Sequence, residues 1–123
     1  MNRFVLASLL FAATTFGALA QQVGGAYTVE GTNLGGGSYS GTALIEGITD
    51  TTCSILWETG GQVSEGICMR YGIAFSAFYA MEGADGPQFG LVIYEIKDNG
   101  TLEGIWTITG ENGAGTEVLT PAN

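Results

Sequence analysis

The feature that most constrains this chain is a series of short segments of alternating polar and apolar residues, separated by breaks rich in Gly, Asn and Asp. Such segments are typical of β-strands joined by tight turns, and none shows a sustained helical period. Eight of them follow one another: Ala26–Gly31, Ser38–Glu46, Thr51–Thr59, Gln62–Arg70, Gly72–Tyr79, Gln88–Lys97, Thr101–Thr109 and Gly115–Thr120. The pattern predicts an all-β fold, an eight-stranded antiparallel up-and-down barrel, with a β-sandwich as the alternative.

The first 20 residues differ from the rest of the chain. Arg3 precedes an uncharged, mostly apolar run over residues 4–16, and Ala18-Leu19-Ala20 places small residues at a cleavage site. This pattern predicts a secretory signal peptide, and the apolar run is shorter than the roughly 20 residues that span a bilayer. We therefore expect a signal peptide over residues 1–20, a single barrel domain over residues 21–123, and a periplasmic or secreted protein.

The charge of the expected domain excludes several functions. Beyond residue 20, Arg70 and Lys97 are the only basic residues against twelve acidic ones, a formal net charge of −10. Nucleic-acid binding and adhesion to anionic membranes both need a basic surface. The absence of histidine also removes Ser-His and Cys-His nucleophiles and histidine-based zinc sites. We expect no cofactor, no metal, no nucleic acid and no membrane insertion, and the acidic surface suits either solubility or a basic partner.

Both cysteines lie in one predicted hairpin. Gly60-Gly61 can form a two-residue turn, because such turns need positive φ. In that register Cys53 faces Cys68 with their Cα atoms about 5.5 Å apart, and Trp57 faces Ser64. A redox-active dithiol is the alternative, but the pair lacks the CxxC spacing and a basic neighbour. The spacing therefore predicts a structural disulfide.

A second hairpin is predicted around Asp98-Asn99-Gly100. A three-residue loop with Gly100 at a bulge places Tyr94 opposite Gly104, with Tyr94 pointing into the barrel. A two-residue Asn-Gly turn is the alternative, and it would turn Glu95 inward.

Four residues are candidates for ligand binding: Trp57, Tyr94, Trp106 and Glu117. Glu117 has the same strand parity as Leu119, so it points inward if Leu119 is buried. Most other acidic residues fall at outward positions or in turns. The aromatic residues suit either a packed core or the wall of a small cavity open at one end. An inward Glu117, acting with Tyr or Thr groups or paired with Glu95, could also serve acid–base catalysis.

The stretches GAYTVEGTNLGGGSYSGTALI, CSILW, GLVIYEIKDNGTLEGIWT and GAGTEVLTP resemble a family of small exported bacterial proteins, some of which carry a fibronectin-binding label. The resemblance covers about residues 25–121 and implies no catalytic residues. In architecture the chain also resembles avidin- and lipocalin-like (calycin) barrels and the small periplasmic inhibitors of lysozyme or proteases.

Together these observations predict an exported, non-catalytic binding or envelope protein that takes a protein or a small ligand at one end of a β-barrel. Two alternatives stay open. One is an inhibitor of a lysozyme or a secreted protease, which the acidic charge would suit. The other is a small enzyme that uses a carboxylate inside the barrel.

Overall fold

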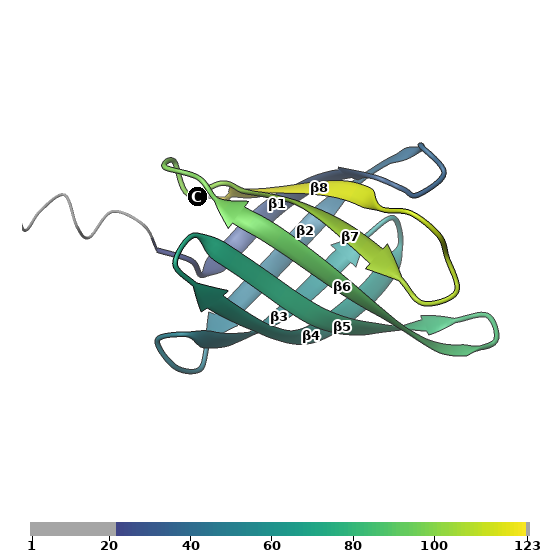
Figure 1. Cartoon of the computed structure of the whole chain (residues 1–123), viewed down its shortest axis with the longest axis horizontal. Helices are drawn as coiled ribbons and strands as arrows, with labels where there is room; N and C mark the ends of the chain where they lie inside the picture. The colour runs from purple at the N-terminus through teal and green to yellow at the C-terminus, as the bar shows by residue number, and fades with distance from the viewer. Residues whose placement is uncertain (1–21, 123) are drawn as a thin grey trace, which may run out of the picture.

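The computed structural model describes residues 22–122, which form a closed antiparallel barrel (Figure 1). Every strand pairs with its neighbours in sequence, and the last strand pairs with the first. The strands are β1 (Gly25–Thr32), β2 (Ser38–Gly47), β3 (Thr52–Thr59), β4 (Gln62–Tyr71), β5 (Ala74–Gly83), β6 (Gly86–Ile96), β7 (Leu102–Ile108) and β8 (Gly115–Pro121). The predicted barrel is confirmed and the sandwich alternative is wrong. The predicted signal peptide lies outside the described residues.

Seven of the eight predicted strands agree with the observed ones to within two residues at each end. The exception is β5, which continues four residues beyond its predicted end at Tyr79. Pairing with β6 runs on to Gly83 opposite Gly86, so only Ala84 and Asp85 form the turn. The Gly, Asp and Pro residues of this stretch suggested a longer break. Pro87 is nevertheless accommodated near the start of β6, where a missing N–H is tolerated best.

The barrel has two different ends. The connections β2–β3, β4–β5 and β6–β7 lie at one end, which we call the closed end, together with the start of β1 and the end of β8. Leu102 and Leu119 are completely buried inside the barrel near this end. Val23 packs against the core, and the amide of Gly24 donates a hydrogen bond of 2.8 Å to the hydroxyl of Tyr27. Apolar packing therefore fills the barrel here, as in an ordinary protein core.

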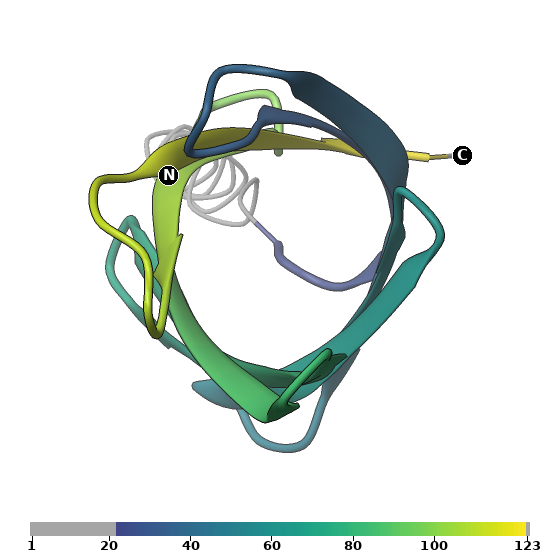
Figure 2. The same cartoon turned by 90° about the vertical axis from the view of Figure 1, so that its right-hand side faces the viewer.

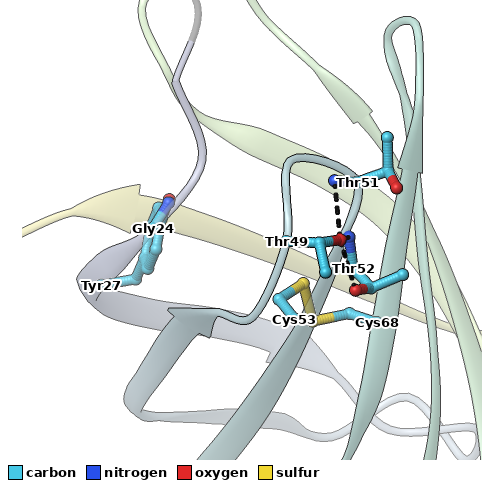
Figure 3. The surroundings of a disulfide bond; sticks show 7 residues. All are labelled: Gly24, Tyr27, Thr49, Thr51, Thr52, Cys53 and Cys68. Carbon is cyan, nitrogen blue, oxygen red and sulfur yellow. Dashed lines mark hydrogen bonds between the residues drawn. A yellow bond between two sulfur atoms is a disulfide. The ribbon is translucent and has the colours of Figure 1, made fainter.

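A disulfide between Cys53 and Cys68 joins β3 to β4 near the closed end, with a Cα–Cα distance of 5.0 Å. The register is the predicted one, because Cys53 pairs with Cys68 and Gly60 and Gly61 both have positive φ, 57° and 80°. Figure 3 shows the bond beside the β2–β3 connection, where the Thr49 hydroxyl accepts hydrogen bonds from the backbone amides of Thr51 and Thr52. The hairpin that carries the only cysteines of the sequence is therefore a covalently closed unit.

The β6–β7 hairpin also follows its predicted register. Tyr94 pairs with Gly104, and the amide of Lys97 donates to the carbonyl of Thr101 at 2.8 Å. Glu95 therefore points outward, where Lys97 Nζ lies 3.3 Å from its carboxylate. The alternative register, which would have turned Glu95 inward, is wrong.

Polar and apolar side chains are unevenly distributed over the outer surface of the barrel. Large apolar side chains are exposed across β4 to β7: Ile67, Met69, Phe78, Phe89, Leu91, Ile93 and Ile105. Phe78 and Phe89 stack on this surface with ring centroids 5.8 Å apart. No helix within residues 22–122 is long and apolar enough to cross a membrane.

Candidate ligand site

A cavity of about 580 Å³ occupies the other end of the barrel, which we call the open end. The connections β1–β2, β3–β4, β5–β6 and β7–β8 lie at this end, and Figure 2 looks along the barrel from it. Residues from three of these connections line the cavity mouth: Asn33, Gly60 and Glu111. The wall below the mouth combines aromatic rings with side-chain amides and one carboxylate: Tyr39, Trp57, Tyr79, Trp106, Gln62, Gln88 and Glu117. The cavity is thus partly apolar with a few converging polar groups.

Glu117 of β8 is the buried acid of this cavity. Its side chain points inward, as expected from its parity with the buried Leu119, and the residue is only 6% exposed. Tyr39 donates a hydrogen bond to Oε1 at 2.7 Å, and the indole of Trp57 donates to Oε2 at 2.9 Å. The hydroxyl of Tyr94 also donates to Oε2. Strands β2, β3 and β6 therefore each send one neutral donor to a single carboxylate, which satisfies a group that is costly to bury.

Cross-strand glycines make room for the aromatic wall. Each of three aromatic residues faces a glycine of the adjacent strand: Tyr39 opposite Gly31, Tyr79 opposite Gly90 and Trp106 opposite Gly115. A Cβ atom on Gly31 would lie 2.5 Å from the ring of Tyr39 and 2.4 Å from a backbone oxygen. Glycine at this position therefore permits the close approach that brings Tyr39 to Glu117.

The tyrosines around Glu117 are held in their neutral form. Burial, and then the negative charge of Glu117, raise the pKa of Tyr79 to about 12. The same two causes, joined by the hydrogen bond that each hydroxyl donates to Glu117, raise the pKa values of Tyr39 and Tyr94 well above the ordinary value. These phenols consequently stay protonated, as hydrogen-bond donors, even above the pH at which an exposed tyrosine ionises.

The structure brings three of the four predicted site residues into one hydrogen-bonded cluster, namely Trp57, Tyr94 and Glu117. Trp106 also lines the cavity, but its indole N–H donates to the carbonyl of Thr116 at 3.3 Å. It therefore contributes a ring surface and not a polar group.

The pairing of Glu117 with a second inward acid, which a catalytic role would favour, is absent from the described barrel, because Glu95 faces outward. Glu111, the other acid that lines the cavity, is exposed at its mouth. Within residues 22–122, no group of three or more acidic, Cys or His side chains is placed to hold a metal ion.

Sequence reasoning missed Tyr39 and Tyr79 as site residues. Tyr39 looked like an ordinary core aromatic, because the glycine-rich connection before it leaves the β1–β2 register open. Tyr79 fell at the end of a predicted strand, so its pairing with Gly90 was hidden. A glycine directly opposite an aromatic residue is the signal that would have identified both, but it is visible only once the register is known.

No family model matches the sequence, and no curated protein matches it either. Three solved structures of similar shape are designed proteins. A redesigned β-barrel has a TM-score of 0.69 at 12% identity, covering 82% of this chain and 92% of its own. A second redesigned barrel, bound to DFHBI, has a TM-score of 0.64 at 14% identity, covering 80% and 94%. A de novo designed fluorescence-activating barrel has a TM-score of 0.59 at 16% identity, covering 83% and 96%. At these identities the likeness establishes the fold alone.

Proposed function

We propose that the protein is an exported, non-catalytic binding protein that takes a small ligand into the cavity at the open end of its barrel. The observation that carries the proposal is the buried carboxylate of Glu117, held by three donors and lining a cavity of about 580 Å³. Ligand pockets in proteins have volumes of about 300–1,000 Å³ and combine apolar walls with a few placed polar groups. This cavity has both properties.

Two observations support export. The first 20 residues have the pattern of a signal peptide. The barrel carries a disulfide between Cys53 and Cys68, and such bonds persist mainly in oxidising compartments. We therefore assign the protein to the periplasm or the cell exterior, as the resemblance to small exported bacterial proteins also implies.

The arrangement around Glu117 favours binding over catalysis. Acid–base hydrolysis by carboxylates commonly uses a pair, and Glu95 points away from the cavity. Both oxygens of Glu117 already accept hydrogen bonds, which fix the side chain in one orientation. A fixed, oriented acceptor is what a binding site requires.

The test uses the two tryptophans, because Trp57 and Trp106 both line the cavity and are the only ones in the sequence. A small-molecule library is screened by thermal shift, and hits are titrated by tryptophan fluorescence. We expect a bound compound to raise the melting temperature and change the emission. A library without a binder, or a bound compound that is turned over, would overturn the proposal.

A matched pair of variants locates the binding. Gln88→Phe enlarges a side chain of the cavity wall, whereas Thr42→Phe adds the same ring on the outer face of β2, where Thr42 is exposed. We expect only Gln88→Phe to weaken the hit. Equal effects from the two variants would place the ligand elsewhere.

The inhibitor alternative is tested separately, since it depends only on the acidic charge and on resemblance in architecture. Lysozymes and secreted proteases are assayed with and without the protein at low and moderate salt. Inhibition that weakens as salt rises would favour this alternative, because charge-driven association is screened by ions.

A further inference from the structure

We propose that the ligand carries an organic cation, an amine or a quaternary ammonium group, that binds between Glu117 and the aromatic wall of the cavity. The inference rests on the proposed function and specifies the chemistry of its ligand. Three properties of the site carry it: the charge of the lining, the unused acceptor capacity of Glu117 and the arrangement of the rings.

The cavity has negative charge and no positive charge of its own. Glu117 and Glu111 line it, and no Lys or Arg does. The two basic residues of the described chain lie toward the closed end, Arg70 near the end of β4 and Lys97 just after β6. An anionic ligand would be repelled here, whereas a cation would meet an uncompensated carboxylate.

The hydrogen bonds to Glu117 satisfy its oxygens without neutralising its charge. The three donors are two phenols and an indole, all of them uncharged. A carboxylate offers about four acceptor positions, and Oε1 receives its side-chain hydrogen bond from Tyr39 alone. One acceptor position and the full negative charge therefore remain for a ligand. A buried charge that lacks a counter-ion is stabilised strongly by one that arrives.

The rings form two steeply inclined pairs, with interplanar angles of 61° and 71°. Trp57 and Tyr79 meet edge to face with centroids 5.1 Å apart, and Tyr39 and Trp106 do so at 6.2 Å. All four residues line the cavity. Aromatic faces attract cations through the ring quadrupole, and cages of such rings are the common device for binding alkylated ammonium groups. The same wall that accepts an apolar group thus also favours a positive one.

The experiment compares probes that share a shape and differ in charge. Binding of phenethylamine, 2-phenylethanol, phenylacetate and benzyltrimethylammonium to the purified barrel is measured by titration calorimetry and tryptophan fluorescence. We expect the two cations to bind on the order of tenfold more tightly than the neutral alcohol, and phenylacetate not to bind. Glu117→Gln should abolish the preference for phenethylamine over the alcohol, while Glu58→Gln, the same change at an exposed position of β3 outside the cavity, should keep it.

The outcomes separate this inference from the proposed function. Binding of the alcohol or the acid as tightly as the amine, or a library hit that is anionic, overturns the cation assignment and leaves a ligand-binding barrel. A library in which no compound of any charge binds overturns both. If Glu117→Gln does not fold, the comparison of probes on the unaltered protein and on Trp106→Phe still decides the matter. A weaker preference for benzyltrimethylammonium in that variant supports the ring contribution, and an unchanged one contradicts it.

Discussion

At the scale of single residues, Glu117 determines the character of the open end. A carboxylate inside a small barrel is costly unless its oxygens are satisfied. Here Tyr39, Trp57 and Tyr94, on three different strands, donate hydrogen bonds to these oxygens. The carboxylate therefore also links parts of the barrel that are distant in sequence. Its inward direction could be predicted from strand parity. The side chains that donate hydrogen bonds to Glu117 could not be predicted, because strand parity does not say which side chains meet across the interior.

Removing one donor tests the importance of this network. Tyr94→Phe keeps the ring and deletes the hydroxyl that donates to Glu117 Oε2. We expect a loss of about 1–3 kcal/mol in the free energy of unfolding, because a buried acceptor loses a partner. Urea denaturation measures it. Tyr71→Phe is the control, since Tyr71 is 88% exposed, and it should change stability by less than about 0.5 kcal/mol. Equal stabilities for the two variants would contradict the account.

At the scale of secondary-structure elements, hairpins with short turns were predictable and longer connections were not. Gly60-Gly61 and Asp98-Asn99-Gly100 fix their registers by turn geometry, and both registers are confirmed. The connection between β1 and β2 is longer and rich in glycine, so many registers fit it. The pairing of Tyr39 with Gly31, and with it much of the site, follows from barrel closure and not from any local signal.

The disulfide-closed hairpin should contribute to stability and not to binding. Replacing both Cys53 and Cys68 by Ala opens a loop whose ends are 15 residues apart. The chain-entropy model predicts a loss of about 3 kcal/mol. Because the bond lies near the closed end, we expect ligand affinity to be kept in the folded protein. Thermal unfolding and a ligand titration below the melting temperature check both parts. Lost affinity in a folded variant would show that the hairpin belongs to the site.

The close approach at Gly31 gives a further prediction. Gly31→Ala places a methyl group 2.4 Å from the Thr116 carbonyl and 2.5 Å from the Tyr39 ring, so one of them must move. We expect destabilisation by about 1–3 kcal/mol and weaker ligand binding, because Tyr39 shifts away from Glu117. Gly47→Ala is the control for denaturation and titration, because an added Cβ there would meet only the Thr49 carbonyl oxygen, at an ordinary 3.9 Å, and Gly47 ends β2 at the closed end. A fully stable Gly31→Ala protein with unchanged affinity would refute this role.

At the scale of the whole molecule, the two ends of the barrel differ in structure. The closed end is packed with apolar side chains and carries the disulfide, whereas the open end holds a cavity with a charged group. The barrel architecture and the inward faces of the strands could be predicted from alternation alone. The difference between a packed end and an end with a cavity could not be predicted from alternation. It depends on the strand tilt and on which side chains meet inside the assembled barrel, such as the small Ser64, which lines the cavity opposite Trp57.

The buried tyrosines of the site make the free energy of unfolding depend on pH in the alkaline range. Phenols such as Tyr79, whose pKa is raised to about 12, keep their protons in the folded barrel, while in the unfolded chain they lose them near pH 10. The unfolded state therefore binds fewer protons above pH 10. The stabilisation present below that value is lost progressively from pH 10 to about pH 12.

Denaturation at a series of pH values, followed together with phenolate absorbance, measures this effect. We expect unfolding and the ionisation of the buried tyrosines to coincide, and the decline in stability above pH 10 to be shallower in Tyr94→Phe, which lacks one of the raised phenols. Stability that stays constant up to pH 12 would contradict the burial of these groups.

The two ends of the described chain both lie at the closed end. β1 starts there, β8 finishes there, and the amide of Ala122 donates to the carbonyl of Ala26 at 2.9 Å (Figure 1). A tether attached beyond either of these ends would therefore leave from the side opposite the cavity. The barrel could be coupled to a surface, or fused to a second protein, with its mouth still open to solution. That geometry suits a sensor in which Trp57 and Trp106 report the arrival of the ligand.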